Sequence, residues 1–145
     1  MKGGISVYSA VDLSKYIVTM CVNDGCPITN LQLQKILYYI QKDYLDRGCQ
    51  AFSDPIEAWK FGPVVREAYY YFCGNGAMPI FSKYDTTIKD EDKVYIDPIV
   101  CEKRKLDPWE LVDDTHKPGH AWAIVFNNGL GYRKIINHDL IRNQG

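Results

Sequence analysis

Apolar residues recur at three- and four-residue intervals over the first third of the chain, and this spacing predicts two amphipathic helices. The first runs from residue 10 to 22, with Ser9 placed to cap its free backbone N–H groups. The second runs from residue 29 to 47 and begins with Thr29 and Gln32, which have the spacing of a capping box. Both helices are therefore predicted to begin at residues whose side chains satisfy first-turn donors.

The second predicted helix carries the clearest apolar stripe in the sequence. Its members follow one another as on one face of an α-helix; they are Leu33, Ile36, Leu37, Ile40 and Tyr44. We expect the polar side chains of this helix to lie mainly away from the stripe, with the Lys35 ammonium in water at the end of a flexible stem. These polar residues are Gln34, Lys35, Gln41 and Lys42.

The helical pattern stops at Pro55, because the residue before a proline avoids the helical conformation. Residues 56 to 61 alternate imperfectly between apolar and polar, which indicates a short strand or extended segment. Gly62 and Pro63 follow. Because proline suits the first helical position, we expect a third helix over residues 63 to 73.

Residues 77 to 105 show no sustained period and are predicted to be irregular. Within them, residues 93 to 96 are a candidate short strand. The charged run at residues 89 to 93 is most simply a solvated loop.

Helical signals return near the C-terminal end. Asp107 can act as an N-cap and Pro108 takes the first position of a helix over residues 107 to 116. Two shorter helices are expected at residues 121 to 126 and 137 to 141. The elements together predict a compact helical domain, mainly α with a small β element, in the α+β class.

The composition fits one globular domain that spans residues 1 to 145, with 46% hydrophobic and 24% charged residues. The net charge of -1 lacks the basic excess that is typical of nucleic-acid binders, so we do not expect nucleic acid as a partner. The eleven tyrosines suit half-buried positions and protein interfaces. Composition therefore favours a protein-binding domain.

Nothing in the sequence directs the chain to a membrane. No apolar run reaches the length of about 20 residues that spans a bilayer. Residues 1 to 10 lack the apolar centre of a signal peptide. The five cysteines form an odd count without regular spacing, which predicts reduced thiols. We therefore expect a cytoplasmic protein.

No pattern of metal ligands stands out. Cys21 and Cys26 have no second pair at the distance of a zinc finger. His116 and His120 are four residues apart, but Pro118 lies between them and disfavours the helix that would align their rings. We expect no metal and no cofactor.

Catalytic signatures are also missing from the sequence. A cysteine could pair with His116 as a nucleophile, yet no local motif marks the three candidates, Cys49, Cys73 and Cys101. The glycines at residues 73 to 76 lack the Lys–Ser/Thr pair of a phosphate-binding loop. We therefore expect that the protein is not an enzyme.

Two helices joined by the short turn at residues 23 to 28 leave a helix-turn-helix as an alternative. The second helix offers few cations, Lys35 and Lys42, and carries the acids Asp43 and Asp46. A packed helical hairpin explains these charges better. A DNA-binding regulator of a phage or mobile element is therefore the alternative function.

Three blocks of the sequence resemble the Panacea domain. They are residues 33 to 41 (LQKILYYIQ), residues 55 to 65 (PIEAWKFGPVV), and Thr115–His116 followed by Trp122. The resemblance extends from about Val11 to Ile141. Ala121 stands where the family usually has proline, and the stretch between residues 84 and 106 looks shortened where relatives often carry another helix.

The resemblance implies the work of an antitoxin. The family includes SocA-like antitoxins and phage-associated proteins, and its members neutralise cognate toxins. At least one relative is a proteolytic adaptor for the ClpXP protease. No enzymatic activity comes with the family. The implied partners are a toxin and, by the adaptor route, a ClpXP-type protease, in a phage or mobile-element context.

Ten residues of these blocks are candidates for partner binding or for the family motif: Lys35, Tyr38, Glu57, Trp59, Lys60, Phe61, Gly62, Pro63, His116 and Trp122. Two interpretations stay open for the central block. Either Trp59 fills the core, or Glu57 and Lys60 flank a groove in which Trp59 or Phe61 anchors a partner. We expect His116 to be hydrogen-bonded to a carboxylate such as Glu57, in a polar cluster shared with Lys35.

Overall fold

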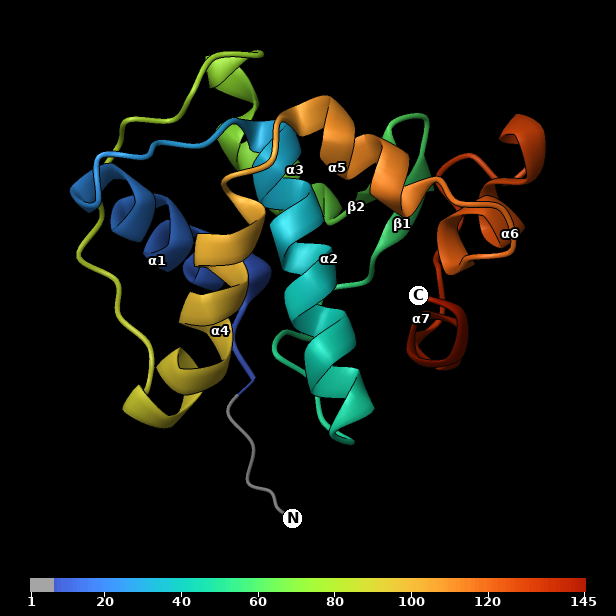
Figure 1. The fold of residues 1–145 in the computed structure, drawn as a ribbon, viewed down its shortest axis with the longest axis horizontal. Coiled ribbons are helices and arrows are strands. Elements are labelled where there is room, and N and C mark those ends of the chain that lie inside the picture. Colours follow the sequence, from blue (N-terminus) through green and yellow to red (C-terminus); the bar gives the residue numbers. More distant parts are fainter. Residues whose placement is uncertain (1–6) are drawn as a thin grey trace.

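The computed structural model describes residues 7–145, so most of the stretch for which no signal peptide was expected lies outside it. Within these residues the fold is mainly α with one small sheet, as predicted (Figure 1). The strands of the sheet are β1 (Glu57–Trp59) and β2 (Gly62–Val64). The helices are α1 (Ala10–Asn23), α2 (Asn30–Asp46), α3 (Arg66–Phe72), α4 (Asp90–Lys103), α5 (Pro108–Thr115), α6 (Ala121–Phe126) and α7 (His138–Gln144), with 3-10 turns η1 (Cys73–Asn75) and η2 (Asn127–Gly129).

The predicted helix starts are confirmed at α1 and α2. The Ser9 side chain accepts a hydrogen bond from the Asp12 backbone N–H at 3.1 Å. At α2 the capping box is complete, because the Thr29 hydroxyl accepts from the Gln32 N–H at 3.1 Å and the Gln32 side chain accepts from the Thr29 N–H at 2.9 Å. Local side-chain chemistry thus sets where both helices begin.

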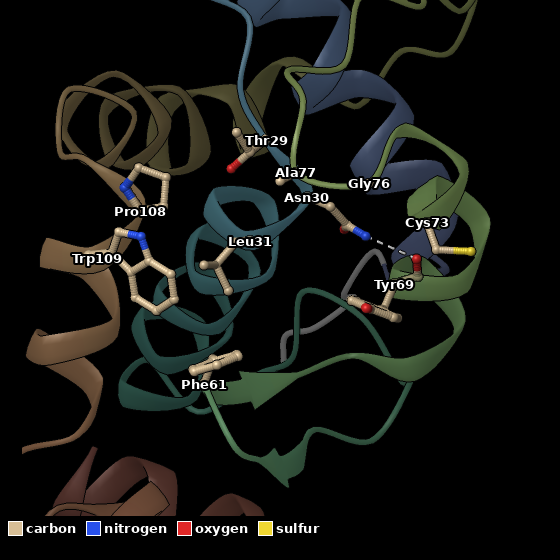
Figure 2. Close-up of a pocket in the computed structure, with 10 residues that line it drawn as sticks. All are labelled: Thr29, Asn30, Leu31, Phe61, Tyr69, Cys73, Gly76, Ala77, Pro108 and Trp109. Carbon is tan, nitrogen blue, oxygen red and sulfur yellow. Dashed lines mark hydrogen bonds between the residues drawn. The ribbon is translucent and has the colours of Figure 1, made fainter.

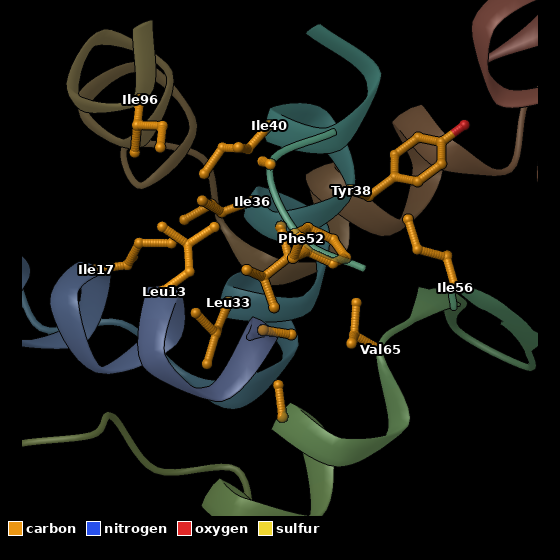
Figure 3. Close-up of a cluster of buried hydrophobic side chains, with 14 of the residues drawn as sticks. Leu13, Ile17, Leu33, Ile36, Tyr38, Ile40, Phe52, Ile56, Val65 and Ile96 are labelled. Atoms are coloured by element: carbon orange, nitrogen blue, oxygen red, sulfur yellow. The ribbon is translucent and has the colours of Figure 1, made fainter. Parts of the chain in front are cut away.

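Helix α2 is the axis of the molecule, with α1 and α4 on one side and the hairpin, α6 and α7 on the other (Figure 1). The core forms where α1, α2 and α4 meet, and Leu13, Ile36 and Ile96 point toward one another there (Figure 3). All five residues of the predicted apolar stripe are buried.

The polar side chains of α2 correct one expectation, because Gln34, Lys35 and Gln41 are buried and not turned to solvent. Neighbouring elements cover the helix on most sides, and their irregular segments leave backbone groups without ladder partners. Gln41 accepts from the Ala51 N–H at 2.8 Å and donates to the Phe52 carbonyl at 2.7 Å. Buried amides on α2 therefore satisfy the loops that wrap it.

The third helix begins later than predicted. Gly62–Val64 pairs with β1, so Pro63 lies in a strand and α3 begins only at Arg66. The other edge of β1 is occupied by a later segment, since the Ala58 N–H donates to the Lys134 carbonyl at 2.9 Å. Strand β2 is thus an edge strand of the hairpin, where a proline without an N–H is tolerated.

The expected irregular stretch contains helix α4, and the predicted strand at residues 93 to 96 is wrong. The charged run is not a loop but the first turn of this helix, where acidic side chains such as Asp90 and Glu91 suit the positive end of the helix dipole. Pro98 lies inside α4 and breaks the sequence pattern that would have revealed it.

The C-terminal helices follow the prediction. Asp107 and Glu110 form a capping box at α5 with Pro108 first, and the Asn137 side chain caps α7 by accepting from the Leu140 N–H at 2.8 Å. The five cysteines are free thiols in this structure. Among residues 7–145 no helix is both long and apolar enough to cross a membrane.

Candidate functional site

The β1–β2 turn divides two hollows on one face of the molecule. The first has a volume of about 410 Å³ and lies between the starts of α2 and α5, the turn and the end of α3. Figure 2 shows Leu31, Phe61, Tyr69 and Trp109 around it. Phe61 and Trp109 meet edge to face, with ring centres 5.2 Å apart. This hollow is apolar in most of its lining.

The second hollow, of about 400 Å³, lies on the other side of the same turn. It shares Leu31, Phe61 and Tyr69 with the first, so the two hollows are neighbours. We call the joint surface of the two hollows the aromatic face. The second hollow adds to it Trp59, Lys60, Tyr70, Tyr132 and Arg133.

Trp59 is half-buried in a cage of aromatic rings. The ring centres of Tyr69 and Tyr70 lie 5.0 Å and 6.1 Å from its own, and the Arg133 guanidinium lies 4.6 Å above the ring. Its indole N–H donates to Glu57 at 2.9 Å. Trp59 therefore packs against the fold and also lines the second hollow.

Glu57 does not flank the hollow and does not reach His116. It is buried, and its carboxylate accepts two hydrogen bonds from Arg66, at 3.0 Å from Nε and 2.6 Å from Nη2. The Arg66 side chain is half-exposed, whereas that of Glu57 is buried. The expected Glu57–His116 bond is wrong because Arg66 and Trp59 already engage this carboxylate.

Lys35 is completely buried beneath the hairpin, contrary to the prediction of a solvated side chain. Its ammonium donates to the Pro63 carbonyl at 3.1 Å, and burial lowers the pKa of Lys35 to about 7. Gly62 lies directly above it with φ +113°, and a Cβ there would stand 2.7 Å from Lys35 Cε. Gly62 is thus required for the close approach of the turn to this lysine.

His116 stacks flat on Trp122, with ring centres 3.7 Å apart. Its Nε2 is buried without a hydrogen-bond partner in the described part of the chain. Burial lowers the pKa of His116, and the nearby charge of Lys35 lowers it further, against a smaller opposite effect of Asp113. His116 and Lys35 therefore lie near each other, as expected, but the charge of Lys35 disfavours protonation of His116. The carboxylate that was expected to bind His116 is not Glu57.

Trp122 and Tyr38 are both buried and contribute to the core. The Trp122 indole donates to the Trp59 carbonyl at 2.7 Å and so ties α6 to the hairpin. Tyr38 is buried, and its pKa is raised to about 12 by burial and by the charge of Asp114. The predicted residues therefore separate into an outer group on the aromatic face and an inner group. The outer group is Trp59, Lys60 and Phe61, and the inner group is Lys35, Tyr38, Glu57, Gly62, Pro63, His116 and Trp122.

Sequence reasoning did not find six residues that complete the aromatic face: Leu31, Tyr69, Tyr70, Trp109, Tyr132 and Arg133. A signal existed for three of them. Trp109 has a large aromatic side chain and lies in the first turn of a helix whose N-cap is clear from the sequence. Tyr69 and Tyr70 belong to a run of three tyrosines that exceeds what one helix face can bury.

The structure gives little support to two other kinds of site. Across residues 7–145 no group of three or more His, Cys, Asp or Glu side chains could hold a metal ion. Helix α2, which would be the recognition helix of a helix-turn-helix, is buried along most of its length. The part of α2 that reaches the surface carries Lys42 beside Asp43 and Asp46, which is not the basic face that a recognition helix presents to a DNA groove.

Comparison with known proteins places this chain in a family. The family model described as "Antitoxin SocA-like, Panacea domain" matches residues 33–123. The curated Antitoxin SocA of Caulobacter vibrioides is 32% identical over 126 residues, which cover 74% of this chain and 67% of that protein. No solved structure gives a significant match. The family model covers α2 from Leu33 onward, the hairpin and Trp122, and on this evidence the chain belongs to the SocA-like antitoxin family that is defined by the Panacea domain.

Proposed function

We propose that this protein is an antitoxin that binds a cognate toxin directly, through the aromatic face, in a phage or mobile-element context. Family membership supports the antitoxin role. The observation that carries the interface is the exposure of large rings at one place: Phe61 is 43%, Trp109 56% and Tyr132 49% exposed. Aromatic side chains gathered around hollows are typical of binding surfaces.

The aromatic face is built on a rigid base. Pro63 is held by the Lys35 ammonium, and Trp59 is held through its carbonyl by the Trp122 indole. The rings that face solvent brace one another edge to face. Because these contacts restrict the side chains before binding, a partner that docks on them loses less conformational entropy.

Co-expression with the toxin tests the proposal. The gene beside this one should be toxic alone and harmless with the intact chain. Phe61→Ala and Trp109→Ala should each restore toxicity, since truncating a central aromatic anchor costs about 2 kcal/mol or more of binding. Leu130→Ala, which removes an exposed apolar side chain outside both hollows, is the matched control and should still protect.

Two outcomes would contradict the proposal. One is full protection by both anchor variants when urea melts show that they are folded. The other is a harmless neighbour together with a pull-down that recovers no protein partner and a DNA shift that vanishes as salt rises, which would favour the alternative of a DNA-binding regulator.

The protein can neutralise its toxin by blocking it or by acting as an adaptor that delivers it to a protease. Delivery to a ClpXP-type protease is the second part of our proposal. A chase of toxin levels in cells with and without a ClpXP-type protease separates the two. Loss of protection together with a stable toxin in the protease-deficient strain supports delivery. Protection that persists in that strain supports simple blocking.

A further inference from the structure

The second hollow combines aromatic walls with two positive charges. Lys60 and Arg133 line it together with aromatic and aliphatic residues, and the lining contains no carboxylate. Neither cation forms an ion pair with another described residue. Complementary charge across an interface selects its partner, so this hollow fits a group that carries negative charge beside an apolar surface.

Arg133 is held in place before any ligand arrives. Its guanidinium lies 4.6 Å above the Trp59 ring, and Nη2 and Nε donate to the Tyr70 and Tyr132 hydroxyls at 3.0 Å and 3.2 Å. These bonds use only part of a donor set of about five N–H groups. The guanidinium therefore keeps donors for a carboxylate while its orientation is already fixed.

The backbone of Arg133 supports the same interpretation. Its φ of +68° lies in the left-handed region, which residues other than glycine rarely adopt. The Arg133 N–H donates to the Ala58 carbonyl at 2.7 Å, and this bond fixes the residue against β1. Such conformations persist only where the surroundings enforce them, and they are concentrated at ligand sites.

We propose that the second hollow receives an acidic side chain of the toxin, an Asp or a Glu, that stands next to an apolar side chain. The carboxylate is recognised by Lys60 and Arg133, and the apolar group enters the first hollow past Phe61. This assignment rests on the proposed function, and it states what the toxin must present. A protein segment is favoured over nucleic acid because two cations on a chain of net charge -1 make too small a basic surface for a phosphate backbone.

Capped peptides test the assignment without the toxin. The probe is acetyl-Ser-Glu-Phe-Ser-amide, and its matched control carries Gln in place of Glu, so the two differ in one charge. Binding is followed by the NMR signal of the Trp59 indole N–H, assigned with Trp59→Phe. We expect the Glu peptide to shift this signal at concentrations about tenfold lower than the Gln peptide.

Variants of the protein provide a second test of the same assignment, with the same two peptides. Lys60→Gln and Arg133→Gln should each remove most of the difference between the peptides, whereas Lys134→Gln, a neighbouring exposed cation outside the hollow, should leave it intact. The Trp122 indole signal reports in each variant that the hairpin is folded, because that N–H is bonded to the Trp59 carbonyl.

The proposal is overturned if neither peptide shifts the Trp59 signal, if both shift it equally, or if Lys60→Gln responds as the intact protein does. It is also overturned if octathymidylate binds more tightly than the Glu peptide, which would make the hollow a nucleic-acid site. A chain that fails this test but still protects cells from its toxin retains the proposed function and loses only this assignment.

Discussion

The Lys35 ammonium is removed from water and donates to the Pro63 carbonyl, and no carboxylate among residues 7–145 forms an ion pair with it. Burial lowers its pKa to about 7 in the folded state, whereas a lysine in an unfolded chain titrates near 10.4. Between these values the unfolded chain binds a proton that the folded chain has released. The free energy of unfolding therefore rises with pH across this window.

Replacing this lysine makes the effect measurable. The unfolding free energy of the intact protein, minus that of Lys35→Met, should increase by about 2 kcal/mol from pH 7 to pH 9. Urea denaturation at several pH values measures this difference. Lys42→Met, on the same helix but only partly buried, is the control and should show no such trend. A flat difference for Lys35→Met would show that the ammonium is not buried as described.

Gly62 tests the close approach of the turn to Lys35. Gly62→Ala should lower the free energy of unfolding by about 3 kcal/mol, because the new methyl group meets both a strained backbone and occupied space. That methyl group would lie 2.7 Å from Lys35 Cε and 2.8 Å from Thr115 Oγ1. Gly25→Ala, at φ +73° with nothing within 4 Å, isolates the backbone effect and should cost only about 1 kcal/mol. Equal losses at both positions would contradict this packing.

Among the elements, α4 is held to its neighbours by hydroxyl–carboxylate bonds. Asp92 in its first turn accepts from the Tyr44 hydroxyl of α2 at 2.6 Å and from the Tyr8 hydroxyl at 2.5 Å. Asp97 accepts from the Tyr16 hydroxyl of α1 at 2.7 Å. Bonds to a charged acceptor are among the stronger ones in proteins.

Asp92→Ala should therefore loosen α4 and lower the free energy of unfolding by about 2–3 kcal/mol. Glu91→Ala is the matched control, because it removes an acidic residue from the same turn and is exposed. Thermal melts of both variants separate the two contributions. If Glu91→Ala is as damaging as Asp92→Ala, the helix dipole and not the tyrosine contacts holds this end of α4.

The elements that sequence reasoning predicted correctly are those with local signals. The N-cap residues of three helices are recognisable in the sequence: Ser9 for α1, Thr29 with Gln32 for α2, and Asp107 for α5. Helix α4 has no such side-chain cap and contains Pro98, so its apolar period is short and broken. The role of Pro63 was misjudged because proline suits an edge strand as well as the first position of a helix, and the pairing of Gly62–Val64 with β1 decides between the two.

On the scale of the whole molecule, the candidate site was only partly predictable. The resemblance identified the hairpin with Trp59, Lys60 and Phe61, but the aromatic face also draws on α2, α3, α5 and the segment before α7. The hydrophobic periodicity of a single segment does not show which other segments it contacts in the folded protein. The burial of Lys35 was missed for the same reason, since helical spacing cannot show that α2 is covered on its polar side.

A natural thiol offers a test of where the toxin docks. Cys73 is exposed at the wall of the first hollow, whereas Cys49 lines a separate one beside α7. Complex formation should slow alkylation of Cys73 by about tenfold or more, as expected when a residue enters the water-excluded part of an interface. Alkylation of Cys49 should be unchanged. Mass spectrometry of the two peptides gives both rates, and an unprotected Cys73 would place the interface elsewhere.

The position of α2 at the axis also determines how the molecule exchanges its amide hydrogens. Helices α1, α3, α4, α5 and α7 all pack on it, so no single neighbour can leave and expose its backbone. Amides of this kind exchange with deuterium only when the entire domain opens. Deuterium uptake along the middle of α2 should therefore follow one common rate, and that rate should fall when a toxin is bound, wherever on the surface it docks.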